Sequence, residues 1–504
     1  MTNLHALPLL SWLIAFPLLS ATTLFLLRHP ARIRSLAIAA GLIELVLSCL
    51  VLLAGDFATD RLVFVERHPW IPSLHIDWHL GIDGLSALFL PSTALLTAAA
   101  IVISRTSVKQ FHALYYALVL ALESFTVGIF CSQDLGLFFL FWELSLVPVF
   151  FLISLWGIGP HRRHAAVKYT LMMFAGGLFL LVGFAVLAID HLQHVGAGGL
   201  AGLTFDLPYL QTHPASRQIQ TVVFLLLLVG FGFKAPIFPF HVWLPVVAME
   251  GPIAITTLLA GLKLGLYGMV RIAFPLTPHA TVEHKSLIAG IGLVSALYGA
   301  LLALRQTNLR RLLAYNGLSH VGLVLIGIAA LNTQGLQGAL FQLITFVFVS
   351  GGLFLICDFL HRRIRTTEIQ ALGGIARAFP LLTSCFFVLL LAAIGVPGTN
   401  GFVGENLILL GAFQSHPGLG FGALLSALLG AAGMIHFFQR AFLKAAQRPE
   451  AYDRVDDLGR HESLLATSFL AVVLLVGTFP HASLAVTESK VEHWLALITG
   501  PHGR

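Results

Sequence analysis

Long apolar stretches separated by short polar connections run through almost the whole chain. A helix needs about 20 mostly apolar residues to cross a bilayer, so each stretch predicts a transmembrane helix. We place about fourteen such spans, at residues 4–27, 35–55, 80–104, 111–131, 134–157, 166–189, 219–240, 253–274, 286–305, 311–331, 335–358, 380–412, 420–443 and 462–480. The pattern therefore predicts an all-α polytopic membrane protein.

Two of the predicted spans are broken. The seventh contains Lys234-Ala-Pro236 and the twelfth contains Gly395 to Gly401, and proline or glycine interrupts the helix at both places. The two spans are five apart, so they cross the membrane in opposite directions. This arrangement predicts two inverted five-helix repeats, at about 111–274 and 286–443, with an ion path near their breaks.

The polar connections complete the predicted organisation. Residues 56–82 predict an interfacial hairpin or helix, and residues 483–499 predict an amphipathic surface helix. We divide the chain into an N-terminal part (1–79), a central core (80–445), and a last span with its tail (446–504).

Charge adds orientation to this picture. Only 10% of the residues are charged, against about 25% in soluble domains. Of the 29 lysines and arginines, 20 fall in loops after odd-numbered spans, 7 in the other loops and tail, and 2 inside spans. The positive-inside rule then places both termini on the non-cytoplasmic side. Topology accounts for the net charge of +6, so we expect no nucleic-acid partner.

The sequence gives little sign of a binding site for a metal or a redox cofactor. The four cysteines, Cys49, Cys131, Cys357 and Cys385, are isolated and lie in or beside apolar runs. Their spacing argues against iron–sulfur, haem and zinc sites and against a disulfide framework. We predict packing thiols, with no metal or redox cofactor bound by this chain.

Four charged residues inside apolar runs are the main candidates for chemistry. A buried Glu143–Lys234 pair could exchange a proton when either partner moves, or could be a permanent ion pair. Lys263 lies near the middle of its span, where snorkelling to the headgroups is difficult. Glu405 follows the second break, where a helix cap is the alternative role. Ionisable residues at such depth are functional candidates by default.

Several further residues have two open interpretations. His241 and His320 suit a proton relay because histidine titrates near neutral pH, and both also suit packing. Glu123 and Glu44 are intramembrane carboxyls that could relay protons or make structural hydrogen bonds. His436 is a weaker candidate.

Four motifs together resemble the antiporter-like subunits of respiratory complex I. They are DLGLFFLFWELSLVP at 134–148, KAPIFPFHVWLP at 234–245, LLAYNGLSHVG at 312–322 and GTNGFVGE at 398–405. The resemblance covers about residues 80–445. It implies a proton-translocating subunit in which Glu143 and Lys234 serve a first half-channel, Lys263 connects, Glu405 serves a second half-channel, and His320 and His241 lie on the polar axis.

The sequence also departs from that family's pattern. Val246 to Glu250 replaces the usual Asp-Ala-His type of segment, Lys263 lies closer to Pro252 than the family suggests, and Phe346 occupies a place where histidine is usual. These departures predict a thinner chain of protonatable groups through the centre, with water bridging more of it.

The resemblance implies a bacterial inner-membrane subunit of an NADH-quinone oxidoreductase. NADH, FMN, iron–sulfur clusters and quinone would then belong to partner subunits, and other antiporter-like subunits would be neighbours. Two alternatives remain open. One is a channel subunit of a related machine, such as a multisubunit cation/proton antiporter, a membrane-bound hydrogenase or an inorganic-carbon uptake complex. The other is a structural subunit with a degenerate channel.

Overall fold

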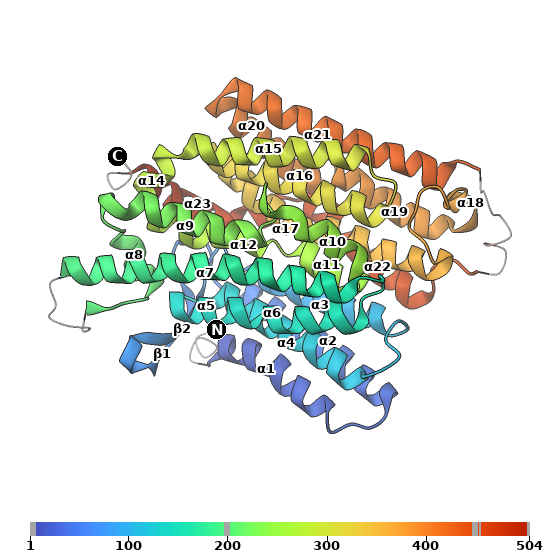
Figure 1. Ribbon diagram of the computed structural model, residues 1–504, viewed down its shortest axis with the longest axis horizontal. Helices are drawn as coiled ribbons and strands as arrows, with labels where there is room; N and C mark the ends of the chain where they lie inside the picture. The colour runs from blue at the N-terminus through green and yellow to red at the C-terminus, as the bar shows by residue number, and fades with distance from the viewer. Residues whose placement is uncertain (1–6, 196–201, 446–451, 453–454, 501–504) are drawn as a thin grey trace.

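The computed structural model describes residues 7–195, 202–445, 452 and 455–500, whose helices lie side by side in an elongated bundle (Figure 1). In this part of the chain, 11 helices are long and apolar enough to cross a membrane. Shorter apolar helices cover the remaining predicted spans, at Leu9–Leu24, Phe89–Ser104 and Pro380–Ala393. The predicted polytopic helical fold is confirmed, whereas the count of fourteen spans, the inverted repeats and the division into parts stay predictions.

The N-terminal helices pack directly on the core. Helix α1 (Leu9–Leu24) lies against α4 (His112–Cys131), and α2 (Pro30–Ala54) lies against α3 (Phe89–Ser104) and also contacts α4. Between α2 and α3 the chain forms the one sheet of the described residues, an antiparallel hairpin of β1 (Val63–Ile71) and β2 (Ile76–Ile82). Of the two forms predicted for this connection, the structure has the hairpin, a small departure from an all-helical chain, and its interfacial position stays a prediction.

The hairpin also closes the exposed end of α1. The Glu66 carboxylate accepts a hydrogen bond from the backbone N–H of Leu10 at 2.7 Å and from that of Ser11 at 3.1 Å. These donors belong to the first turn of α1, where no backbone acceptor is available. Glu66 thus fixes the helix to the hairpin.

The core contains two long series of helices. The first comprises α4, α5 (Leu135–Leu144), α6 (Leu146–Trp156), α7 (Arg162–Val195), α8 (Leu207–Thr212), α9 (Arg217–Lys234), η4 (Phe240–Val242), α10 (Trp243–Glu250), α11 (Ile253–Gly261), α12 (Leu264–Gly268), η5 (Met269–Ala273), α13 (Phe274–Leu276) and α14 (Pro278–Glu283). The second comprises α15 (Lys285–Leu304), α16 (Leu309–Ala329), α17 (Thr333–Ile364), α18 (Ile375–Ala378), α19 (Pro380–Ala393), α20 (Asn400–Ser415), α21 (Pro417–Phe438) and η6 (Gln439–Leu443).

Burial identifies the centre of the bundle. Helices α16 and α17 are buried over nearly their whole length, whereas α2, α21 and α22 (Arg460–Thr478) expose most of their apolar side chains. A helix that is apolar all round is buried in protein or faces lipid. The central helices are therefore enclosed by protein, and the peripheral ones form the outer surface of the bundle.

Helix α23 (His481–Thr499) confirms the amphipathic helix predicted for the tail. Its apolar face docks onto protein, because Trp494 is 1% exposed and its indole N–H donates to the carbonyl of Val270 at 2.8 Å. The described ends of α1 and α23 lie toward the same end of the bundle as the hairpin (Figure 1). Which side of the membrane this end faces stays a prediction. Arg448, Arg454 and Arg504, part of the charge count, lie outside the described residues.

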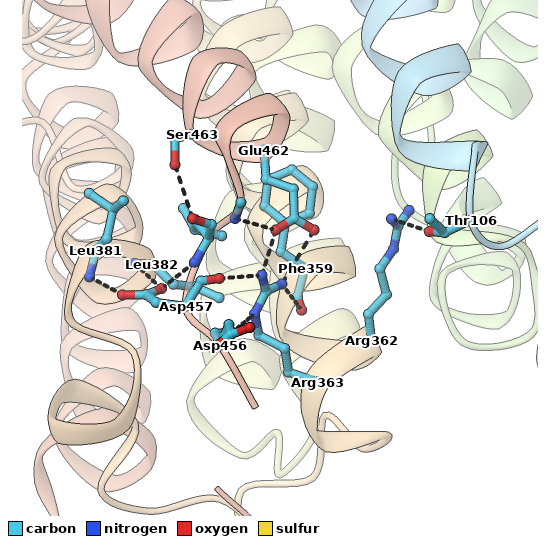
Figure 2. Close-up of polar contacts among 12 residues, drawn as sticks. Thr106, Phe359, Arg362, Arg363, Leu381, Leu382, Asp456, Asp457, Glu462 and Ser463 are labelled. Atoms are coloured by element: carbon cyan, nitrogen blue, oxygen red, sulfur yellow. Dashed lines mark hydrogen bonds and ion pairs between the residues drawn. The ribbon is translucent and has the colours of Figure 1, made fainter. Parts of the chain in front are cut away.

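A cluster of charged side chains ties helices together (Figure 2), near α18 and away from the hairpin end of the bundle (Figure 1). Arg363 of α17 donates to the backbone carbonyls of Asp456 and Asp457 and to the Glu462 carboxylate of α22. The Asp457 side chain accepts from the backbone of Leu381 and Leu382 at the start of α19. These contacts of the loop before α22 thereby connect the ends of α17, α19 and α22.

Candidate functional site

Lys234 is the last residue of α9, at the first predicted break. Its Nζ donates to Oγ of Ser145 at 2.8 Å and to the carbonyl of Trp142 at 3.3 Å, and it lies 4.0 Å from the centroid of the Trp142 ring. Pro236 removes the backbone donor for the carbonyl of Gly232, which accepts from the N–H of Ile237 at 3.4 Å instead. The carbonyl of Phe233 in turn accepts from the indole N–H of Trp243 at 2.8 Å. The break thus holds the ammonium group between α5 and α9.

Glu143 lies beside this ammonium group but does not form an ion pair with it in this structure. Among the described residues no donor reaches its Oε1, and the Lys234 ammonium donates to Ser145 and Trp142 instead. Gly177 of α7 leaves the space for the carboxylate, because a Cβ there would overlap Oε1. The structure therefore does not show the permanent Glu143–Lys234 ion pair that the sequence left open as an alternative.

Lys263 interrupts the eighth predicted span, which the sequence did not lead us to expect. It lies between α11 and α12 with non-helical dihedrals (φ −97°, ψ 59°) and is only 3% exposed. Because the side chain is buried, it does not snorkel to the surface of the protein. Its Nζ makes no hydrogen bond to any residue that the structure describes. Gly265, two residues on, packs so closely on Ala235 that a Cβ would overlap the Ala235 backbone. The eighth span therefore touches the first break.

Glu405 and His320 meet at the second break. Oε1 of Glu405 lies 3.3 Å from Nδ1 of His320, although the two atoms are not aligned for a hydrogen bond. Glu405 lies on the second turn of α20 and does not cap the helix, because no acidic residue occupies the first turn. Gly395 has φ +67°, and a Cβ there would overlap the Glu405 carboxylate.

Phe346 lies beside both the central lysine and His320 of this second site. The centroid of its ring lies 5.5 Å from Nζ of Lys263 and 5.6 Å from the centroid of the His320 ring. The side chain is 1% exposed. The aromatic ring thus stands at the place where the resemblance led us to expect a titratable histidine.

Several neutral polar side chains near the second site were not singled out from the sequence. Gln342 Oε1, Thr345 Oγ1 and both polar atoms of Asn400 are buried without a hydrogen-bond partner among the described residues. Gln342 lies against Gly404, next to Glu405. Buried polar atoms without protein partners are typical positions for internal water. Their lack of partners depends on packing between distant helices, so no sequence signal could reveal it.

The remaining candidates lie in different surroundings. His241 is 6% exposed and packs against Phe238 and Tyr298, with ring centroids 5.8 Å and 5.2 Å away. Glu123 is buried on α4 and lines a cavity with Lys234, and Glu44 is buried on α2. His436 is exposed on α21. The structure therefore brings together Glu143, Lys234 and Glu123 on one side, and Lys263, His320 and Glu405 on the other.

The divergent Val246 to Glu250 segment forms most of α10. Glu250 fastens the connection between α6 and α7: its carboxylate accepts from the backbone N–H of His161 at 2.7 Å, and its carbonyl accepts from that of Gly159 at 3.1 Å. This segment holds a loop at the end of the bundle and does not contribute a group to the central sites.

A second buried charge cluster lies near the hairpin. Asp83, between β2 and α3, pairs with Arg271 and with Nζ of Lys490 at 3.2 Å, and Arg271 also donates to Gln133 at 2.7 Å. Burial alone would raise the pKa of Asp83, but the charges of Arg271 and Lys490 outweigh it and hold the pKa at about 2. The sequence gives no sign of this cluster, because Asp83 and Lys490 are 188 and 219 residues away from Arg271 along the chain.

No three His, Cys, Asp or Glu side chains come together as metal ligands within the described ranges. The four cysteines are unpaired thiols, three of them buried. The titratable groups at the two breaks are therefore carboxyl, ammonium and imidazole groups.

Comparison with known proteins identifies relatives over nearly the whole chain. Residues 132–430 match the family described as NADH:quinone oxidoreductase/Mrp antiporter, TM. NADH-quinone oxidoreductase subunit M of Rickettsia typhi is 32% identical over 97% of this chain and 99% of its own length. NADH-ubiquinone oxidoreductase chain 4 of Marchantia polymorpha is 32% identical over 96% of each chain.

Solved structures agree with the sequence comparison. A chain of respiratory complex I from Thermus thermophilus is 30% identical and superposes with a TM-score of 0.88 over 97% of this chain and 100% of its own. A chain of the Mrp complex from Dietzia sp. is 21% identical, with a TM-score of 0.80, and shows the shared fold alone. The chain described here belongs to the NADH:quinone oxidoreductase/Mrp antiporter transmembrane family, as an antiporter-like membrane subunit.

Proposed function

We propose that this chain translocates protons as a membrane subunit of NADH-quinone oxidoreductase, driven by partner subunits that oxidise NADH and reduce quinone. The single observation that supports this most strongly is Lys263. Its ammonium group is buried in the middle of the bundle, lacks a hydrogen-bond partner among the described residues, and sits where the eighth span touches the first break. A buried lysine in such surroundings readily gains and loses its proton.

The geometry suggests an order of transfer. Lys234 can exchange a proton with Glu143. The resulting change of charge would alter how readily Lys263 holds its own proton. Lys263 interacts electrostatically with His320, which contacts Glu405. Water at the unpaired groups of Thr345, Gln342 and Asn400 would carry the proton past Phe346.

The partners follow from the relatives. NADH, FMN, iron–sulfur clusters and quinone would be bound by other subunits, and other antiporter-like subunits would flank the exposed apolar helices in the bacterial inner membrane. The termini would face the non-cytoplasmic side. Relatives named as subunits of NADH-quinone oxidoreductase match this chain from end to end, which favours this assembly over a related cation antiporter.

Substitution at the first break tests the relay. In the assembled complex, we expect Lys234→Ala and Glu143→Ala each to reduce proton pumping at least tenfold, because each removes one member of the exchanging pair. Lys285→Ala, which removes an exposed lysine at the start of α15, is the matched control. Normal pumping in both Lys234→Ala and Glu143→Ala would show the relay assignment to be wrong.

Purification tests the assembly separately. We expect flavin- and cluster-bearing subunits to accompany the chain when it is extracted from its native membrane with a mild detergent. A cation antiporter assembly or a soluble carbonic-anhydrase-like partner in their place would contradict the proposed driving force while leaving the pore residues relevant.

A further inference from the structure

Two buried carboxyl groups take no part in the order of transfer described above. Glu44 is on α2 and Glu123 is on α4, and each is 1% exposed. The two helices pack against each other, and the carboxyl groups interact electrostatically. Neither the order of transfer above nor the resemblance to the family uses Glu44.

Neither carboxyl group has a stabilising partner in the protein. All four oxygens are buried without a hydrogen-bond donor among the described residues, and no described cation lies within 4.0 Å of them. Leaving one carboxylate buried and unpaired costs several kcal/mol or more. Two neighbouring carboxylates add mutual repulsion, so such pairs hold at least one proton.

Two other buried carboxyl groups among the described residues, those of Glu66 and Asp83, have partners. Glu66 accepts two backbone N–H bonds at the start of α1, and Asp83 pairs with Arg271 and Lys490. Carboxyl groups retained for structure are thus bonded here, whereas Glu44 and Glu123 are not. A structural role alone does not account for the pair.

A cavity connects Glu123 to the first break. It has a volume of about 30 Å³ and is lined by Glu123 and Lys234 together with the hydroxyl-bearing Thr93, Thr97, Thr126 and Ser145. This volume holds about one or two water molecules, which need two to four polar partners each. Ser145 already accepts from the Lys234 ammonium at 2.8 Å. Lys234 therefore faces a second carboxyl group besides Glu143.

We propose that Glu123 forms a side branch of the relay, which exchanges protons with Lys234 through this cavity, and that the charge of Glu44 on the adjacent helix influences this exchange. In the transfer, the Lys234 ammonium gives a proton to water in the cavity, and that water gives one to the Glu123 carboxylate. A lysine amine and a carboxylic acid result, and no net charge is created. Glu44, on the adjacent helix α2, is the second carboxyl group of the pair. This inference rests on the proposed proton translocation.

The test uses the purified complex with Glu44→Gln and Glu123→Gln, alone and together. Glutamine keeps the side-chain shape and removes the titrating group. In infrared difference spectra against the wild type, we expect each single variant to lose or shift a carboxylic-acid C=O band that is sensitive to D2O. We expect pumping per NADH oxidised to fall about tenfold in Glu123→Gln and less in Glu44→Gln, which does not line the cavity.

Control variants separate this inference from the proposed function. Glu66→Gln removes a buried but satisfied carboxyl group and should leave the D2O-sensitive band unchanged. Glu123→Asp, which keeps an acid, should retain a shifted band and partial pumping, and it serves if a glutamine variant does not assemble. Unchanged band and pumping in both glutamine variants would overturn the side branch. Normal pumping in Lys234→Ala would instead overturn the relay, whatever the infrared spectrum shows.

Discussion

At the scale of single residues, two glycines make room for the carboxyl groups of the candidate sites. Gly177 lies opposite Glu143 and Gly395 lies opposite Glu405, and a Cβ at either position would overlap the carboxylate. Gly177 lies on α7, distant in sequence from Glu143. Gly395 precedes the second break, and Glu405 follows it. The two glycines therefore offer tests that leave every titratable group in place.

Gly177→Ala should impair pumping through the position of Glu143. The overlap costs about 1–3 kcal/mol unless the carboxylate moves, and we expect a rate of pumping about tenfold lower. Gly290→Ala is the control, because a Cβ there meets nothing within 4 Å. Combining Gly177→Ala with Glu143→Asp, which shortens the side chain, should restore part of the activity. A double variant no better than the single variants would contradict this explanation.

Gly395→Ala should act in the same way on Glu405. Gly395 and Gly398 both have positive φ, +67° and +92°, so alanine costs about 1–2 kcal/mol of backbone strain at either position. Only Gly395 also faces the Glu405 carboxylate. We expect proton pumping to fall several-fold more in Gly395→Ala than in Gly398→Ala at equal assembly. Equal losses would mean that strain alone is responsible.

The sequence predicts charged members of the site better than neutral ones. A lysine or glutamate inside an apolar run is conspicuous, and the structure buries Lys263, Glu405 and Glu123 as expected. Gln342 and Asn400 have no such signal, because their unpaired state results from how α17 and α20 pack. The partnership of Glu123 with Glu44 likewise depends on the contact between α2 and α4.

At the scale of elements, proline and glycine mark some breaks and leave others unmarked. The breaks after Lys234 and before Asn400 follow from Pro236, Pro239 and the glycines around Pro397, and both are found in the structure. The break at Lys263 contains no proline and is surrounded by leucine and glycine. Its position is set by close packing on the first break, which the sequence of one span cannot encode by itself.

The tail helix α23 should depend on the buried charge of Asp83. Asp83→Asn leaves Arg271 and Lys490 without their counter-charge, which costs about 3–5 kcal/mol for a buried pair. We expect faster hydrogen exchange in α23 and weaker docking of the tail. Asp60→Asn is the control, because Asp60 pairs with His493 near the surface, where the cost is about 0–1 kcal/mol. Equal exchange in the two variants would contradict a structural role for the Asp83 cluster.

The same cluster makes a prediction for pH. The folded pKa of Asp83 is held at about 2, below its ordinary value of 3.8. Its contribution to stability is therefore complete above pH 4 and is lost as the pH falls toward 2. In Asp83→Asn, tail docking should lack this acid-dependent step, which hydrogen exchange at a series of pH values would show. An identical acid profile in the variant and the wild type would argue against it.

At the scale of the whole molecule, the charge pattern and the fold agree on one bundle with two different ends. The hairpin, α8 and α23 lie at one end (Figure 1). The charged cluster around Arg363 of α17, drawn in Figure 2, lies at the other. Hydropathy predicts this organisation because each span is long and apolar. Sidedness, neighbours and driving force depend on the membrane and on other subunits.

Orientation can be measured directly. Single cysteines replacing Ser73 in the hairpin connection or His164 at the start of α7 should react from opposite sides of sealed membranes. We expect a membrane-impermeant thiol reagent to label the Ser73→Cys variant from the non-cytoplasmic side, in a background without the four native cysteines. Labelling from the cytoplasmic side would reverse the predicted topology.

The most direct test of the account is proton pumping by the assembled complex with Lys263→Met or Lys263→Arg, reconstituted into sealed vesicles and driven by NADH. Methionine removes the central titratable group, and arginine keeps a charge that does not readily release its proton. The account predicts that both variants assemble and that both lose most of their pumping. Pumping at the wild-type ratio of protons to electrons in both variants would contradict the central place of Lys263 in the relay.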